Sequence, residues 1–135
     1  MKKGLPVRFN LMINGYVGEG RREELNTVEG INLFLRKVCE WADMKLITTQ
    51  TINLDDAIND GDWYGLSGLA MIATSHVAFH IWPTYDSYYM FDISSCKSFS
   101  PDDLIAKIEE YFEHKCEWNS YQDFTPLKYL ESKQE

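Results

Sequence analysis

The feature that most restricts the fold is a strict alternation within TSHVAFHIWP, residues 74–83. In a β-strand, Val77, Phe79 and Ile81 share one face, which is uniformly apolar and suited to a core. His76 and His80 fall on the opposite face. Imidazoles are costly to bury unless they are paired or chemically employed. The segment therefore predicts a strand with one face in the core and the other available to line a pocket.

Three further segments have strand patterns. Apolar residues alternate from Leu5 to Ile13 and again within residues 87–94, and β-branched residues fill residues 45–54. Residues 66–83 predict two strands or one bent strand. The acidic, turn-rich residues 55–65 predict a loop.

Two segments have helical spacing. An apolar stripe runs from residue 28 to residue 42, and either Asn26 or Thr27 can cap the helix that carries it. Residues 100–114 begin with Ser100 as a cap and Pro101 at the first helical position, and they place acidic residues in the first turn. From Cys116 onward the sequence has no clear period.

The resulting order is β-α-β-β-β-α with short connections. It predicts an α+β fold, a two-layer sandwich in which a mostly antiparallel β-sheet carries two helices on one face. A chain of 135 residues fits one domain, residues 1–135. The second face of the sheet would need cover, and a homodimer is an economical way to supply it.

Charge and cysteine content exclude several classes of partner. The net charge of −8 disfavours nucleic acid and anionic membranes, and no apolar run approaches the roughly 20 residues that span a bilayer. The N-terminus has no apolar signal region. The three cysteines, Cys39, Cys96 and Cys116, match neither a zinc pattern nor a disulfide framework. We expect a reduced, cytoplasmic protein with no metal site and no nucleic-acid or membrane partner.

The segments GLSGLAMIATSHVAFHIWP and YYMFDISSCKSF resemble the short prokaryotic S-adenosylmethionine decarboxylase proenzymes, which are pyruvoyl-dependent. Residues 25–38 also resemble the first helix of that family. The motif positions occur in the family's order, with one extra residue before the last of them. They are Ser67-Gly68, Ser75, His80, Trp82-Pro83 and Cys96.

The resemblance implies a self-made cofactor. The Ser75 hydroxyl would attack the carbonyl of Thr74 to form an ester, and β-elimination would then cut the chain and leave a pyruvoyl group at residue 75. Ser67 and His80 would assist processing. The pyruvoyl carbonyl would form a Schiff base with S-adenosylmethionine and withdraw electrons as CO₂ leaves, a step in spermidine and other polyamine biosynthesis. Cys96 would return a proton to the product.

Substrate contacts follow from the same resemblance. Trp82 would offer an aromatic face to the adenine ring, and Trp63 and Tyr64 lie near the position where the family has a second ring. Cationic substrates gain about 0.5–2 kcal/mol from each aromatic contact. A plainer interpretation treats the two histidines as structural residues, Cys96 as a small apolar residue and Trp82 as part of the core.

Two positions depart from the family pattern. Thr74 stands where the family has a glutamate before the precursor serine. Thr84 stands where a glutamate is expected to grip the ribose, and Asp86 could replace it. Three hypotheses follow: an S-adenosylmethionine decarboxylase with a rearranged ribose site, a pyruvoyl decarboxylase of another amino acid such as ornithine or arginine, or an unprocessed, non-catalytic relative.

Overall fold

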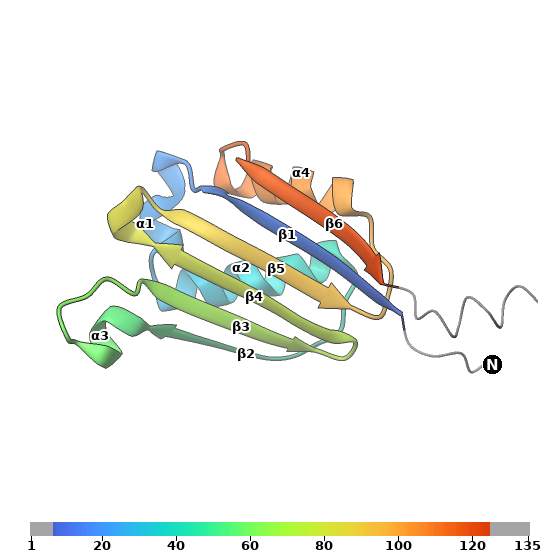
Figure 1. The fold of residues 1–135 in the computed structure, drawn as a ribbon, viewed down its shortest axis with the longest axis horizontal. Helices are drawn as coiled ribbons and strands as arrows, with labels where there is room; N and C mark the ends of the chain where they lie inside the picture. Colours follow the sequence, from blue (N-terminus) through green and yellow to red (C-terminus); the bar gives the residue numbers. More distant parts are fainter. Residues whose placement is uncertain (1–6, 125–135) are drawn as a thin grey trace, which may run out of the picture.

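The computed structural model describes residues 7–124. Six strands form one sheet in the order β2-β3-β4-β5-β1-β6, and every neighbouring pair is antiparallel (Figure 1). The strands are β1 (Arg8–Tyr16), β2 (Leu46–Asn53), β3 (Leu66–Ile72), β4 (Ser75–Trp82), β5 (Tyr88–Ser95) and β6 (Trp118–Phe124).

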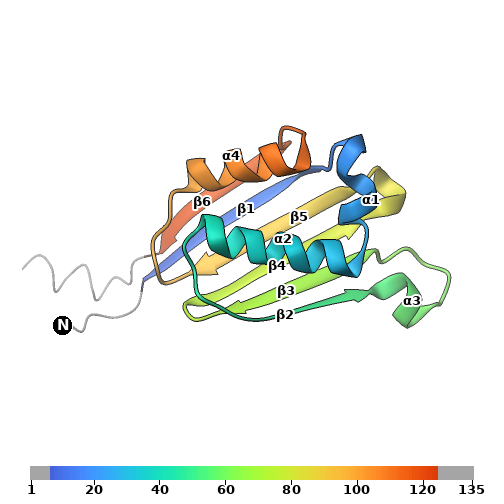
Figure 2. The same cartoon turned by 180° about the vertical axis from the view of Figure 1, so that it is seen from behind.

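Two long helices cover one face of this sheet. Helices α2 (Val28–Trp41) and α4 (Pro101–Phe112) lie across the same side (Figure 2). The side chain of Thr27 caps α2 by accepting a hydrogen bond from the Gly30 amide, and Ser100 caps α4 in the same way. The predicted α+β class, with an antiparallel sheet and helices on one face, is confirmed. Shorter helices are η1 (Glu19–Arg21), α1 (Arg22–Leu25), α3 (Leu54–Ile58) and η2 (Pro83–Tyr85).

The structure adds elements that the sequence pattern did not predict. Strand β6 pairs with β1 at the edge of the sheet, and most of its side chains are exposed, so no apolar alternation marks it. Helix α3 occupies the start of the predicted loop. The segment 66–83, predicted as two strands or one bent strand, forms two strands joined by a tight turn at Ala73 and Thr74. The start of the first predicted strand, at Leu5, lies outside the described residues.

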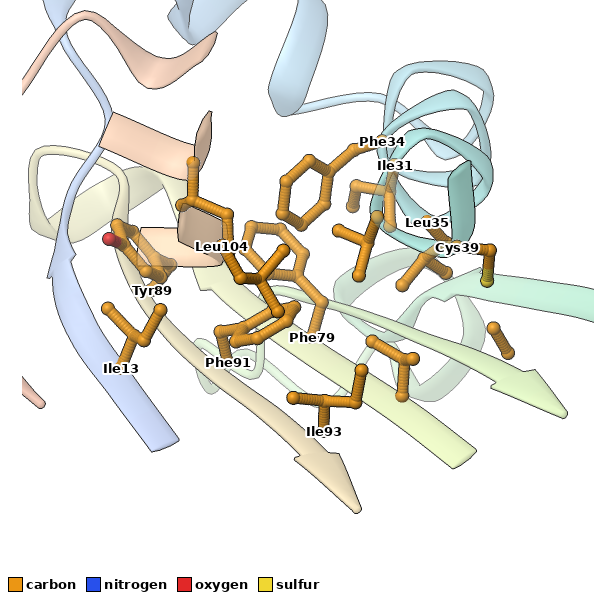
Figure 3. Packing of buried hydrophobic residues seen from close by; sticks show 14 of the residues in the cluster. Ile13, Ile31, Phe34, Leu35, Cys39, Phe79, Tyr89, Phe91, Ile93 and Leu104 are labelled. Carbon is orange, nitrogen blue, oxygen red and sulfur yellow. The ribbon is translucent and has the colours of Figure 1, made fainter. Parts of the chain in front are cut away.

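The core fills the space between the sheet and the two helices (Figure 3). The Phe34 ring of α2 lies 5.0 Å from that of Phe79 on β4 and 4.7 Å from that of Phe112 on α4, between ring centroids. Val77, Phe79 and Ile81 are fully buried, as the alternation predicted. Burial of this face therefore fixes the opposite orientation of His76 and His80.

Gly68 brings helix α2 close to the sheet. A Cβ atom at this position would lie 2.6 Å from Cγ2 of Ile31 and 2.8 Å from Oγ1 of Thr51. A larger residue would push α2 away from β3. The glycine faces the helix, so its neighbour Ser67 faces the other side of the sheet.

The opposite face of the sheet, here called the helix-free face, exposes many large apolar side chains. Between about 40% and 60% of each is accessible on strands β1, β2, β3, β5 and β6. The set comprises Met12, Ile52, Leu69, Met71, Met90, Trp118 and Phe124. Among the described helices, none is long and apolar enough to cross a membrane.

Candidate active site

The turn between β3 and β4 is tied to two distant segments. The Ala73 amide donates a 2.9 Å hydrogen bond to the carbonyl of Lys45, before β2. The Thr74 carbonyl accepts a 3.0 Å hydrogen bond from the Cys96 amide, after β5. The structure thus places the Cys96 amide beside the Thr74–Ser75 peptide bond, although Cys96 lies 21 positions after Ser75 in the sequence.

Ser75 departs from ordinary strand geometry. Its φ is 156°, a value that residues with a side chain rarely adopt. Its Oγ lies 3.1 Å from Nδ1 of His76, and both residues line a hollow on the helix-free face with Leu69 and Met71. Strict alternation would have placed Ser75 and His76 on opposite faces. The distorted backbone brings them together, so the sequence pattern missed His76 as a contact of Ser75.

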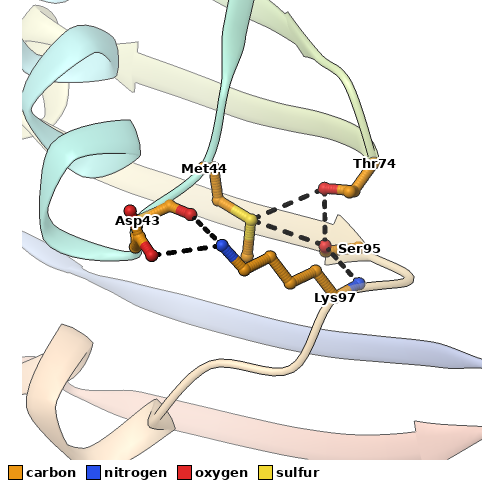
Figure 4. A network of polar contacts seen from close by, with 5 residues as sticks. All are labelled: Asp43, Met44, Thr74, Ser95 and Lys97. Atoms are coloured by element: carbon orange, nitrogen blue, oxygen red, sulfur yellow. Dashed lines mark hydrogen bonds and ion pairs between the residues drawn. The ribbon is translucent and has the colours of Figure 1, made fainter.

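The side chain of Thr74 joins a polar network (Figure 4). The buried Ser95 hydroxyl donates to Thr74 Oγ1 over 2.9 Å and accepts from the Lys97 amide over 2.9 Å. Thr74 Oγ1 also donates to Sδ of Met44 over 3.5 Å. Ser95 therefore links the turn to the segment that carries Cys96. In the sequence, this linking role of Ser95 is indicated only by its position directly before Cys96.

Ser67 and His80 form a second polar pair. They lie opposite each other in the register of β3 and β4, and Ser67 Oγ is 2.7 Å from His80 Nδ1. Burial lowers the pKa of His80, and the nearby carboxylate of Asp92 acts in the other direction. The imidazole is thus favoured in its neutral form, which can accept or donate a proton. Both residues line a hollow that shares Leu69 with the one at Ser75.

The two pairs are well separated within one chain. His80 follows Ser75 by five strand positions, which corresponds to roughly 16 Å at about 3.3 Å per residue. Ser67 lies beside His80 at the same distance from the turn. One chain therefore does not bring Ser67 and His80 to Ser75.

The predicted aromatic contacts lie at the far end of the sheet from the turn. The Trp82 ring centroid is 6.3 Å from that of His80 and 6.1 Å from that of Tyr88. Trp63 is exposed and makes an edge contact with the ring of Tyr85, at 5.9 Å between centroids. Trp82 thus continues the polar face of β4, and Trp63 lies in the adjoining loop.

Tyr64 is engaged within its own loop. Its hydroxyl donates a 2.6 Å hydrogen bond to Asp60, and this bond raises the pKa of Tyr64 to about 12. The Asp55 carboxylate accepts from the amides of Tyr64 and Gly65. These bonds give the altered loop a defined shape.

Thr84 and Asp86 lie at the end of β4. Thr84 belongs to η2 and is exposed. Asp86 follows it with a φ of 56°, and 83% of its side chain is accessible. Its carboxylate lies 4.0 Å from Nη1 of Arg22. The Asp86 carboxylate is thus accessible to a ligand, which would compete with the long ion pair to Arg22.

Comparisons with known proteins identify the family of the chain. The family model described as S-adenosylmethionine decarboxylase matches residues 11–122, which include every predicted site residue. The chain belongs to the S-adenosylmethionine decarboxylase family. Members of the family are carboxy-lyases, so the predicted family and enzyme class are confirmed.

Named relatives give the same assignment. The chain is similar to an S-adenosylmethionine decarboxylase proenzyme of Clostridium botulinum, with 30% identity over 89 residues, 65% of this chain and 70% of that protein. A proenzyme of the same name from Acidithiobacillus ferrooxidans is 38% identical over 50 residues, 36% of this chain and 37% of that protein. Nothing in these matches favours an ornithine or arginine decarboxylase.

The fold is also that of a solved member of the family. The crystal structure of the adenosylmethionine decarboxylase from Aquifex aeolicus VF5 matches with a TM-score of 0.59 and 17% identity, and the match covers 90% of each chain. At this identity the match bears on the fold alone. Within residues 7–124, no group of histidine, cysteine and acidic residues is arranged to hold a metal ion.

Proposed function

We propose that this chain is a proenzyme that cuts itself between Thr74 and Ser75 and then decarboxylates S-adenosylmethionine. The main support for this proposal is the geometry of the turn between β3 and β4. The Thr74 carbonyl is held by the Cys96 amide, and the Ser75 hydroxyl next to it has a hydrogen-bonding imidazole within reach. A polarised carbonyl and a hydroxyl beside a base both support conversion of the serine to a pyruvoyl group.

The first step is an acyl shift. Ser75 Oγ attacks the Thr74 carbonyl carbon, the Thr74–Ser75 C–N bond breaks, and the Ser75 nitrogen takes up the proton that Oγ lost. Negative charge develops on the Thr74 oxygen during the attack. The Cys96 N–H, already 3.0 Å away, stabilises that charge.

The second step is β-elimination. A base removes the Ser75 Cα proton and the Thr74 carboxylate leaves with Oγ. Water then replaces the Ser75 nitrogen, releasing ammonia and leaving the pyruvoyl group. When formed, that group supplies an electron sink for loss of CO₂ from an amino acid. The Cys96 thiol would serve as the proton donor to the product.

The active unit is a homodimer in which the helix-free faces meet. Three features support this arrangement: the exposed apolar face, the roughly 16 Å from Ser75 to His80, and the location of Trp82 still further along β4. Antiparallel apposition of two copies brings the Ser67–His80 pair of one copy toward the Ser75 turn of the other. Each site would then combine the cleaved end of one chain with the binding face of the second.

Cytoplasmic location is part of the proposal. Cys39, Cys96 and Cys116 are all free thiols, and Cys96 is exposed. An exposed thiol that must stay reduced fits a reducing compartment.

Intact mass spectrometry of purified protein tests the processing. The expected result is two fragments divided before Ser75, the larger with a carbonyl-reactive N-terminus. Release of CO₂ from S-adenosylmethionine, with ornithine and arginine as comparisons, tests the substrate. A single chain that stays intact for days would overturn the proposal.

Complementation tests the shared site. Ser75→Ala and His80→Ala chains should each be inactive alone. When they are co-expressed, random pairing leaves one complete site in half of the dimers, so about a quarter of the wild-type activity should return. Recovery no greater than the sum of the separate variants would contradict a site built from two chains.

A further inference from the structure

We infer that His76 is the general base of the acyl shift, an assignment that rests on the proposed self-cleavage. Its Nδ1 lies 3.1 Å from Ser75 Oγ. Of the three histidines in the chain, His76 is the one whose ring contacts this hydroxyl: His80 bonds Ser67, and His114 bonds the Lys115 carbonyl. His76 therefore touches the reacting atom directly.

His76 alone can carry out both proton transfers of the acyl shift. In the tautomer with hydrogen on Nε2, Nδ1 of His76 accepts the Oγ proton as Oγ bonds to the Thr74 carbonyl carbon. When the C–N bond breaks, the same nitrogen returns that proton to the Ser75 nitrogen. No proton is gained or lost overall, and the product is the ester.

The surroundings of Ser75 favour this transfer. The φ of 156° turns Ser75 out of the strand pattern and onto the side of His76, at the edge of the hollow lined by Leu69 and Met71. The scissile carbonyl accepts a hydrogen bond from the Cys96 amide. Nucleophile, base and charge-stabilising donor thus surround one peptide bond within a single chain.

This assignment gives the two histidines of β4 different roles. His76 acts within its own chain on the acyl shift. His80, roughly 16 Å away along the strand, can reach a Ser75 turn only in the second copy. Ester formation should then depend on His76 and proceed without the dimer's shared contacts.

To test this assignment, self-cleavage of the full-length His76→Ala variant is measured over time. Ser75→Ala and His114→Ala serve as controls. Intact mass spectrometry measures cut chain over time, and hydroxylamine reports ester because it cleaves esters and leaves amides intact. We expect His76→Ala to cut at least 100-fold more slowly than wild type, with no hydroxylamine-sensitive material. His114→Ala should cut at the wild-type rate, and Ser75→Ala should not cut.

Chemical rescue separates chemistry from structure. Because His76 borders an open hollow, added imidazole should restore cleavage of His76→Ala and leave Ser75→Ala intact. His76→Gln, which keeps hydrogen-bonding capacity, replaces the alanine variant if near-ultraviolet circular dichroism shows that variant to be unfolded. It should also cut at least 100-fold more slowly than wild type.

Three results would overturn the assignment: cleavage of a folded His76 variant within threefold of wild type, accumulation of its ester, or no response of folded His76→Ala to imidazole. A wild-type chain that does not cut would instead overturn the proposed function. The two failures are therefore distinguishable in one experiment.

Discussion

The amide of Cys96 donates a 3.0 Å hydrogen bond to the carbonyl oxygen of Thr74. This bond ties the end of β5 to the β3–β4 turn and fixes the orientation of the carbonyl that self-cleavage would attack. An amide already aimed at this oxygen needs no rearrangement as charge develops there. The side chain of Ser95, the residue before Cys96, supports this geometry by hydrogen bonding to Thr74 Oγ1 and to the Lys97 amide.

Removing the Ser95 hydroxyl should slow self-cleavage. Ser95→Ala leaves Thr74 Oγ1 and the Lys97 amide without their common partner, a loss of about 1 kcal/mol or roughly fivefold in rate. Thr74→Val should slow cleavage by a similar factor. Because both changes break the hydrogen bond between Ser95 and Thr74, the double variant should be little slower than Ser95→Ala alone. Mass spectrometric time courses measure this; multiplicative effects would contradict the coupling.

Asp86 should contribute to substrate affinity. If its carboxylate takes the place of the family's ribose glutamate, Asp86→Ala removes charge-assisted hydrogen bonds and raises KM for S-adenosylmethionine by about 10- to 100-fold. The value of kcat should change little, because the ribose is remote from the bond that breaks. Asp102→Ala, an exposed carboxylate on α4, is the control. Unchanged KM in Asp86→Ala would remove this residue from the site.

A charge on the helix-free face should separate the dimer. Met12 is 42% exposed in the middle of β1, so Met12→Lys would bury a lysine in the proposed interface. Analytical ultracentrifugation should show a shift from dimer to monomer. Leu33→Lys changes a residue of α2 that is 39% exposed, and should leave the dimer intact. A stable Met12→Lys dimer would place the interface elsewhere.

Much of the fold could be read from the sequence because burial imposes periodicity. Val77, Phe79 and Ile81 alternate, and Thr27 and Ser100 mark the helix starts, so strands and caps were predictable. Strand β6 was not, because an exposed edge strand has no buried face to impose a pattern.

The candidate site could be proposed from the sequence only through its resemblance to the family. The family motif singled out Ser67, Ser75, His80 and Cys96, whereas alternation alone separated Ser75 from His76. The φ of 156° at Ser75 cancels that separation. The sequence pattern does not reveal a backbone distortion of this kind, so the contact between Ser75 and His76 could be identified only from the structure.

His80 should make stability sensitive to acid. Burial lowers its pKa in the folded state below the value of 6.5 of a free histidine, so the unfolded chain binds a proton that the folded chain resists. Well above pH 6.5 both states are neutral, and His80 then leaves the unfolding free energy unchanged. As the pH falls below that value, stability is lost, until the folded state also protonates.

Urea unfolding at about pH 7 and pH 5 measures the effect. His80→Gln should reduce the fall in unfolding free energy between the two, because glutamine does not titrate. His114→Gln, the same substitution at an exposed histidine, is the matched control for the change of residue type. An equal fall in wild type and His80→Gln would show that protonation of His80 is not what weakens the fold in acid.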